Sequence, residues 1–507
     1  MVSYFQVDAL EYDALEVLSM VRSMRNTFAP VNRTPPEILS LIPDYLEDDD
    51  RDENLIGLTH VCRSWREIFI SRSSLWTRLD LESVEKTQVY IERSKSTPLK
   101  IHLEPPYEEE ALLLAIPHIR RLKTLSVYGD SDELLPVLVE HFSCPLPLLV
   151  DLKVDFKSDD DDDDDGGVPT LPHELFNRDL SSLRELTLMG VITPLPWRDL
   201  SDLTTFNLCT PNDEILLTQL LDFFESASHL RHIRLYNSLP SSSNAPTKRV
   251  VSLPHLKDLS ITTNQLHSIL LNHLSIPAGA SLRLEFEFDD EDSPISSHLP
   301  ESPGNFCNLS HITAINLCFG LERRYLRFNG PSGELYILGN RIHRVESHNA
   351  RTSRVIQYLT QFDISRTQRL AITLHSYRPS DPAQITKSTL YRALNRMEDL
   401  RTLMLIRCEI LPFIHTLNPD KNPSKAVLCP RLEEIVFYIN HQDLLHVDEL
   451  VYMAKERALR DAKLSAITVV NIDEVAPKKG VFRLRQYVSC VEYKFDDVLP
   501  EWDILPG

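Results

Sequence analysis

The sequence predicts an α/β protein, in which a short helical module precedes a right-handed solenoid of parallel strands and helices. Three observations support this fold class. Apolar residues recur at positions i, i+3 and i+5 along most of the 507 residues, helical patterns lie between these sets, and two short amphipathic patterns precede them. In such a repeat the strands stack edge to edge and line the concave face, while the helices cover the convex face.

Residues 1–29 are expected to form an N-terminal amphipathic helix. One stripe of this helix is apolar at helical spacing. We expect the stripe to pack against the rest of the chain, and its members are Leu10, Ala14, Val17, Leu18 and Val21.

Residues 30–80 form the next segment, which we call the helical module. Thr34-Pro35-Pro36-Glu37 has the pattern of a helix cap with Pro35 in the first helical position. Apolar residues then keep helical spacing from Ile38 to Leu46 and from Leu55 to Phe69. Pro43 lies inside the first of these helices and removes a backbone hydrogen bond, so we expect a kink there.

The repeat occupies residues 81–475, in about a dozen irregular copies. The last two apolar residues of each set are two apart, which is strand periodicity. Helical patterns separate the sets at 212–224, 381–394 and 444–459, while 320–370 fits poorly and shows only degenerate strands such as 335–337. The ten clear sets are Leu122/Leu125/Val127, Leu149/Leu152/Val154, Leu183/Leu186/Leu188, Leu203/Phe206/Leu208, Leu230/Ile233/Leu235, Leu256/Leu259/Ile261, Ile312/Ile315/Leu317, Leu400/Leu403/Leu405, Leu432/Ile435/Phe437 and Leu464/Ile467/Val469.

An acidic run interrupts the repeat at 159–167, where seven aspartates precede two glycines. Mutual repulsion predicts a disordered surface loop. The run is not a calcium loop, because its twelfth position is Pro172 rather than glutamate. Residues 476–507 form a C-terminal tail outside the repeat.

Composition excludes several functions. The chain has 53 basic and 74 acidic residues, a net charge of −21, which argues against nucleic acid and anionic membranes as partners. With only 13 glycines it has no glycine-rich phosphate loop, and it also lacks the common metal and nucleophile motifs. We therefore expect no catalysis, no metal and no cofactor. The eight cysteines lack C-x-x-C spacing and are expected to be free thiols.

Acidic residues interrupt the first 25 positions, and no run approaches ~18 apolar residues. The expected location is cytoplasmic and/or nuclear.

The helical module resembles an F-box, the adaptor-binding motif of Skp–cullin–F-box ubiquitin ligases. The most specific part is Val61-Cys62-Arg63-x-Trp65, and Leu75-Trp76 closes the motif. It departs from the family pattern in its opening residue, a longer spacer and Pro43. The resemblance implies binding to a Skp-type adaptor, and through it to cullin, by Pro36, Ile38, Leu39, Ile42, Leu46, Leu55, Leu58, Val61, Cys62, Trp65, Leu75 and Trp76.

The repeat resembles irregular leucine-rich repeats of the L-x-x-L-x-L-x-x-N/C type, with Asn264, Cys408 and Asn440 at the last position. An F-box followed by such repeats is the layout of leucine-rich-repeat F-box proteins. That family implies a non-catalytic substrate receptor, whose solenoid holds a protein target. The basic candidates for target contact are Lys123, Arg184, Arg231, Arg234, Lys257 and Arg401.

Three alternatives stay open at this point. The chain could bind the adaptor yet act as a scaffold outside a ligase, or the helical module could simply cap the solenoid core. An enzyme on a repeat scaffold is the third, and the missing motifs count against it.

Overall fold

The structure is a computed structural model. It describes residues 4–46, 51–156, 168–172, 175–178, 180–192, 200–210, 216–239, 249–263, 265–288, 300, 306–307, 312–319, 323–329, 334–341, 359, 362–374, 387–439, 445–471 and 480–495. The chain divides into two compact units, described separately below. Unit 1 comprises Met1–Asp165 and Leu171–Leu183, and unit 2 comprises Gly166–Thr170 and Arg184–Gly507. The acidic run at 159–165 and the tail after 495 lie outside the described residues.

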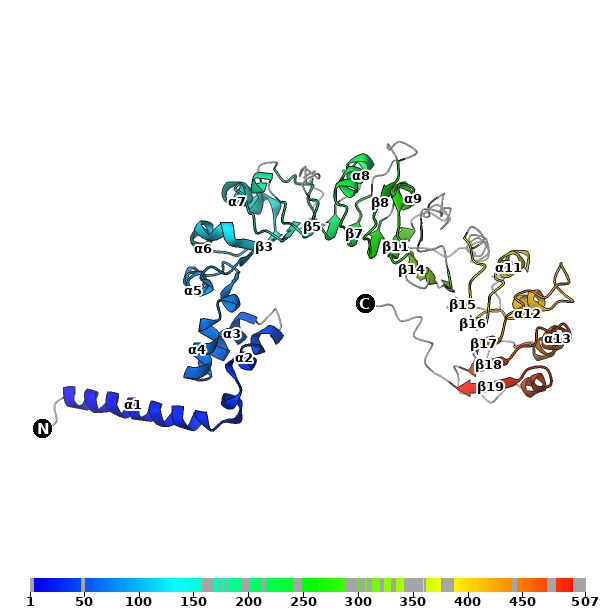
Figure 1. The fold of residues 1–507 in the computed structure, drawn as a ribbon, viewed down its shortest axis with the longest axis horizontal. Helices are drawn as coiled ribbons and strands as arrows, with labels where there is room; N and C mark the ends of the chain where they lie inside the picture. The colour runs from blue at the N-terminus through cyan, green and yellow to red at the C-terminus, as the bar shows by residue number, and fades with distance from the viewer. Residues whose placement is uncertain are drawn as a thin grey trace. The chain divides into compact units, whose positions relative to one another are not determined.

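Unit 1 joins the N-terminal helices to a parallel sheet, in which β1, β2, β3 and β4 pair in sequence order. Helices α5, α6 and α7 lie on one side of these strands (Figure 1). The helices are α1 (Tyr4–Thr27), α2 (Pro36–Leu39), α3 (Arg51–His60), α4 (Arg63–Ser71), α5 (Val84–Ser94), α6 (Glu109–Ala115) and α7 (Ser131–Phe142). The strands are β1 (Arg78–Leu79), β2 (Leu99–Leu103), β3 (Leu122–Gly129) and β4 (Asp151–Phe156). The short 3-10 helices are η1 (Pro30–Arg33), η2 (Ile42–Tyr45), η3 (Ser73–Trp76), η4 (Ile116–Arg121) and η5 (Leu175–Arg178).

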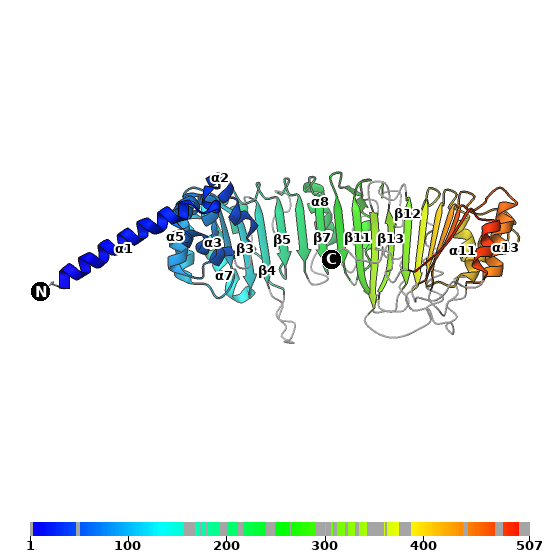
Figure 2. The same ribbon diagram turned by 90° about the horizontal axis from the view of Figure 1, so that it is seen from below.

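Unit 2 is built on a long, mostly parallel sheet whose strands lie side by side (Figure 2). Its main strands are β5 (Glu185–Met189), β6 (Thr205–Cys209), β7 (His232–Tyr236), β9 (Asp258–Thr262), β11 (Ser281–Phe288), β12 (Ala314–Phe319), β13 (Arg323–Asn329), β14 (Glu334–Arg341), β15 (Arg369–Leu374), β16 (Thr402–Ile406), β17 (Glu434–Ile439), β18 (Ala466–Asn471) and β19 (Cys490–Phe495). A small parallel pair, β8 (Val251–Ser252) and β10 (Leu274–Ser275), lies apart from this sheet. The helices are α8 (Leu217–Ser226), α9 (Ser268–Leu271), α11 (Lys387–Leu394), α12 (Leu411–Leu417), α13 (Val447–Ala458) and the 3-10 helix η10 (Val481–Gln486).

The strand positions are confirmed. All ten predicted apolar sets coincide with strands, and the last two residues of each set are buried. In β6, for example, Phe206 and Leu208 are buried while Thr205, Asn207 and Cys209 are only half-buried. Alternation therefore directs one face of each strand toward the apolar core and the helices.

One stretch of unit 2 departs from the expected parallel arrangement. From β11 the neighbours follow the order β14, β13, β12, β15, and β13 is antiparallel to both β12 and β14. Only three residues separate β12 from β13, and four separate β13 from β14. Connections this short can join only antiparallel neighbours, because a parallel crossover needs a dozen residues or more. The parallel arrangement expected for the repeat does not hold in this stretch, where β13 and β14 lie within the residues 320–370 that fitted the repeat poorly.

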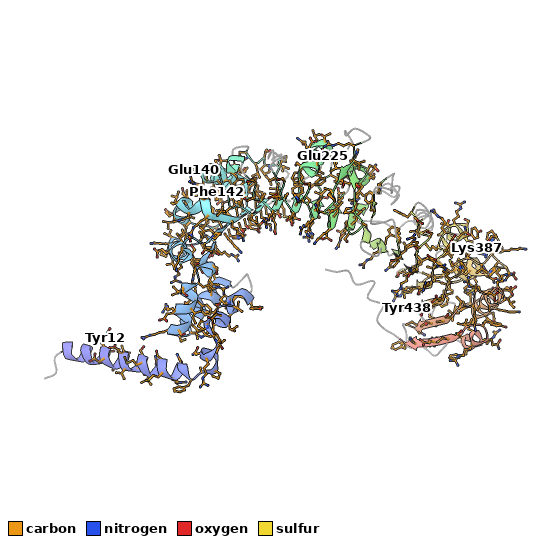
Figure 3. The ribbon with its side chains drawn as sticks, viewed as in Figure 1. Tyr12, Glu140, Phe142, Glu225, Lys387 and Tyr438 are labelled. Atoms are coloured by element: carbon orange, nitrogen blue, oxygen red, sulfur yellow. The ribbon has the colours of Figure 1, made fainter. Side chains whose placement is uncertain are left out.

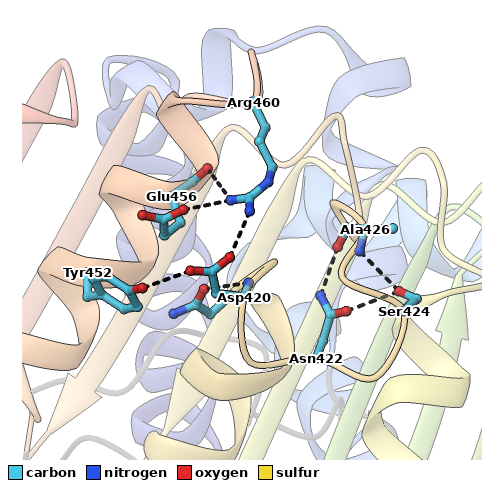
Figure 4. Close-up of polar contacts among 8 residues, drawn as sticks. Asp420, Asn422, Ser424, Ala426, Tyr452, Glu456 and Arg460 are labelled. Atoms are coloured by element: carbon cyan, nitrogen blue, oxygen red, sulfur yellow. Dashed lines mark hydrogen bonds and ion pairs between the residues drawn. The ribbon is translucent and has the colours of Figure 1, made fainter.

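The described helices of unit 2 lie on one face of its sheet (Figure 1). We call the opposite side the open face. Figure 4 shows how a loop after α12 is fixed on the helix side. Asp420 accepts a hydrogen bond of 2.8 Å from the Tyr452 hydroxyl and forms an ion pair of 2.8 Å with Arg460. Arg460 also forms an ion pair with Glu456. These contacts join consecutive repeats on the side away from the open face.

Within the described part of the chain, no helix is both long and apolar enough to span a membrane. The same residues contain no group of three or more potential metal ligands. The seven cysteines whose side chains are described form no disulfide with one another.

Candidate functional site

The first helix of the helical module begins one residue later than predicted. Pro35 precedes Pro36 and is held in extended backbone at ψ 141°, so α2 starts at Pro36 and no side chain caps it. The predicted capping box at Thr34 is therefore absent. The helix expected from Ile38 to Leu46, with a kink at Pro43, is instead two short helices: α2 ends at Leu39, and Pro43 lies in the separate 3-10 helix η2.

Trp76 anchors the end of the helical module. Its side chain is fully buried, and Nε1 donates a 3.0 Å hydrogen bond to the carbonyl oxygen of Phe69. The indole packs edge-to-face on the Tyr90 ring, with the two ring centres 5.1 Å apart. The Arg93 guanidinium lies 4.3 Å from the centre of the Trp76 indole. The last turn of the module is thus fixed against α5, the first helix that follows it.

Lys86 makes a second link between the module and α5. Its Nζ lies 2.9 Å from Asp52 of α3 and also pairs with Asp80, which follows β1. Burial by itself would raise the pKa of Asp80, but the hydrogen bond and charge of Lys86 outweigh it, so the pKa is lowered. The Asp80 carboxylate is consequently held charged beside the Lys86 ammonium group.

Burial divides the twelve predicted adaptor contacts into three groups. Leu39, Leu55, Trp65, Leu75 and Trp76 are buried in the module itself. Ile42, Leu46, Leu58 and Cys62 are half-buried, whereas Pro36, Ile38 and Val61 are exposed. The exposed fractions of Ile38 and Val61 are 54% and 53%.

Three further apolar side chains of the module are exposed and are not among the twelve predicted adaptor contacts. They are Leu41, Tyr45 and Ile56, and Tyr45 is 86% exposed. Tyr45 lies seven residues after Ile38, at helical spacing, which is the signal that could have identified it. Several apolar side chains of one small module are thus exposed together, as at a surface that binds a partner.

A second candidate surface lies on the open face of unit 2. A cavity of about 440 Å³ opens between β12, β13 and β15 to β19. Tyr438 lies on this open face of the sheet, whereas Lys387 lies on the helix side (Figure 3). The lining residues are Ala314, Ile315, Asn316, Arg327, Arg369, Leu370, Ala371, Thr402, Met404, Glu434, Val436, Tyr438, Thr468, Val470, Glu492, Lys494 and Phe495.

Strand register explains why this cavity is apolar at its floor. Ala371, Met404, Val436 and Thr468 stand directly beside one another on successive strands. Arg369 and Lys494 lie at its margins, in the neighbouring rows. Asn316 continues the floor onto β12, and its buried Oδ1 has no hydrogen-bond partner among the described residues.

The six predicted basic target contacts lie elsewhere. All are exposed, and none lines the cavity. Lys123 belongs to β3 in unit 1 and Arg234 to β7, whereas Arg184, Arg231, Lys257 and Arg401 immediately precede β5, β7, β9 and β16. The structure does not bring them into one cluster around a cavity, and their role stays a prediction.

Comparison with known families identifies the helical module. A family model described as F-box-like matches residues 32–82. Domains of this kind typically occur in non-catalytic substrate receptors, so the match indicates an adaptor-binding role in ubiquitin ligase complexes. A search of curated proteins found no match to the chain.

Proposed function

We propose that this protein is the non-catalytic substrate-recognition subunit of an SCF-type ubiquitin ligase. The helical module would bind a Skp-type adaptor, and the adaptor would connect the chain to cullin. The observation that carries the proposal is the sorting of apolar side chains in the F-box-like module. One set builds its core, while Ile38, Tyr45 and Val61 remain exposed.

Adaptor binding would remove these side chains from water. Each apolar side chain that becomes fully buried contributes about 1.5–3 kcal/mol. The buried set, including Trp65 and Trp76, would then act by holding α2, α3 and α4 in place rather than by contact. This assignment makes the exposed residues the informative ones to mutate.

The strand–helix repeats are proposed to form a leucine-rich-repeat solenoid that holds the target on its open face. The cavity favours one apolar side chain of an extended target segment, packed on Met404 and Val436. Asn316 also lines this cavity and would offer that segment a polar side chain beside the apolar anchor. Both cations and carboxylates border the cavity, so the target segment is expected to be polar beside its apolar anchor.

The mechanism would be proximity. The chain fixes a target near a ubiquitin-charged enzyme and raises its effective concentration there, while the partner carries out the bond chemistry. Such complexes act in the cytoplasm and/or the nucleus, which is the location we propose.

Reconstitution tests the proposal. The full chain, a purified Skp-type adaptor and a cullin should elute together as a three-component complex. Elution of the chain with the adaptor but without cullin would favour the alternative, a scaffold acting outside a ligase. Failure to bind the adaptor at all would contradict both.

A further inference from the structure

Helix α1 carries an apolar seam that its own chain leaves open. Ala14, Val17, Val21 and Met24 are spaced 3, 4 and 3 residues apart, and Phe28 continues the series after another 4. This is the heptad spacing of a helix that pairs with another helix. Val17, Val21 and Phe28 are 60%, 55% and 72% exposed. The expectation that this stripe packs on the rest of the chain was wrong.

The contacts of α1 within unit 1 use its other side. Among residues 11–26, the α1 side chains that the structure describes, Ser19, Ser23 and Asn26 are half-buried. Arg63 donates a 2.7 Å hydrogen bond to the Ser19 hydroxyl, and Asn32 Nδ2 donates one of 2.7 Å to the Asn26 carbonyl oxygen. At 3.6 residues per turn these three residues lie about 170° around the helix from the seam. The polar side of α1 therefore meets its own chain, and the apolar seam points away.

The charges of α1 are divided along its length. Glu11, Asp13 and Glu16 lie before Val17, whereas Arg22 and Arg25 lie after Val21. Two copies of α1 side by side in parallel would place each charge beside its like. An antiparallel pair would place the acidic half of each helix beside the basic half of the other. The occupant that this helix fits is a second copy of itself.

We propose that two copies of this protein associate through an antiparallel coiled coil of their α1 helices. Centred on residue 19, Val17 packs against Val21 of the second copy, and Ala14 packs against Met24 of the second copy. On one flank, Glu11 of each copy lies beside Arg25 of the other copy. The two Leu18 side chains meet between these two charge pairs. The two Met20 side chains meet on the other flank. The pairing thus covers Leu18 and Met20, which are 43% and 59% exposed in the single chain.

The oligomeric state of the full chain tests this proposal. Sedimentation or light scattering over roughly 1–100 µM should show a reversible dimer. V17E/V21E places carboxylates in the seam and should raise the dimer Kd more than about 100-fold. Y12E/L15E adds the same charge to exposed side chains that lie off the seam, and it should leave the dimer intact (Tyr12 is labelled in Figure 3). Circular dichroism should show that both variants keep the fold.

Charge reversal tests the orientation. E11R and R25E should each raise the dimer Kd about 3- to 10-fold, and the double variant should restore it, because each residue faces the other across the pair. A wild-type chain that remains monomeric up to about 100 µM would overturn the proposal, as would a dimer that survives V17E/V21E. Single reversals without effect would overturn the antiparallel register.

Discussion

Trp65 Nε1 donates a hydrogen bond of 2.7 Å to Oδ1 of Asn32. The bond joins α4 to the 3-10 helix η1, across 33 residues of sequence. The Trp65 indole is buried and meets Phe69 edge-to-face at 5.6 Å. Asn32 was not among the predicted functional residues, yet it positions the most specific tryptophan of the motif.

Asn32→Ala should loosen the helical module. It leaves the buried indole N–H of Trp65 without its acceptor, which costs about 1–3 kcal/mol. Hydrogen exchange should therefore accelerate at the amides of α4. Asn54→Ala, an exposed change in α3, is the control and should leave exchange nearly unchanged. Equal protection in N32A and wild type would show that the bond has no structural role.

The identity of the helical module was predictable from sequence, but its contact surface was not. The spacing of Trp65 and Leu75-Trp76 identifies the motif without any structure. Ile38 and Leu39 are adjacent apolar residues in one short helix, and only packing decides that Leu39 is buried and Ile38 exposed. Two prolines in a row also moved the helix start, which the capping pattern alone did not reveal.

His267 should make unit 2 sensitive to acid. Burial lowers its pKa from 6.5 to about 4, although hydrogen bonds to the Ile261 and Glu285 backbone partly oppose this. The unfolded chain then binds a proton that the folded chain does not, so stability is lost as pH falls from 6.5 toward about 4. The loss from this group should reach about 3 kcal/mol.

His267→Gln keeps a side-chain N–H donor and cannot titrate in this range. Hydrogen exchange of β9 and α9 amides, followed between pH 4 and 7, should show a smaller pH dependence in the variant than in wild type. The same pH dependence in both proteins would exclude His267 as the source.

Arg457→Met should destabilise the C-terminal repeats. The guanidinium is fully buried and donates hydrogen bonds of 2.8 and 2.9 Å to the carbonyl oxygens of Leu428 and Cys429. Losing both bonds should cost about 3 kcal/mol. Urea unfolding would measure the change. Arg460→Met, three residues away in an exposed ion pair, is the control and should change stability much less.

The sheet was predictable where one face of a strand is apolar and the other polar. The cavity was not predicted, although β17 and β18 carry a signal for it. Residues 435–438 and 467–470 are nearly continuous apolar runs rather than alternating ones. Such runs indicate strands with apolar residues on both faces. The reversed order of β12 to β14 depends on short connections, which apolar spacing does not encode.

Met404→Glu should abolish target capture if the cavity holds the target. The carboxylate would occupy the apolar floor and remain unpaired beneath a bound side chain. Affinity capture with the full chain, read by mass spectrometry, should lose the wild-type target set. Arg184→Glu/Arg231→Glu tests the basic positions instead and should leave that set unchanged. Loss of the set only in the arginine variant would place the target at those positions.

Adaptor binding tests the central claim most directly. Calorimetry should compare the full chain with I38D/V61D and with L113D, whose leucine is similarly exposed on α6 outside the module. We expect I38D/V61D to lose at least about 100-fold in affinity for a Skp-type adaptor, because charges would enter the desolvated contact. L113D should bind as wild type does. Unchanged affinity in I38D/V61D, with the module still folded, would contradict the account.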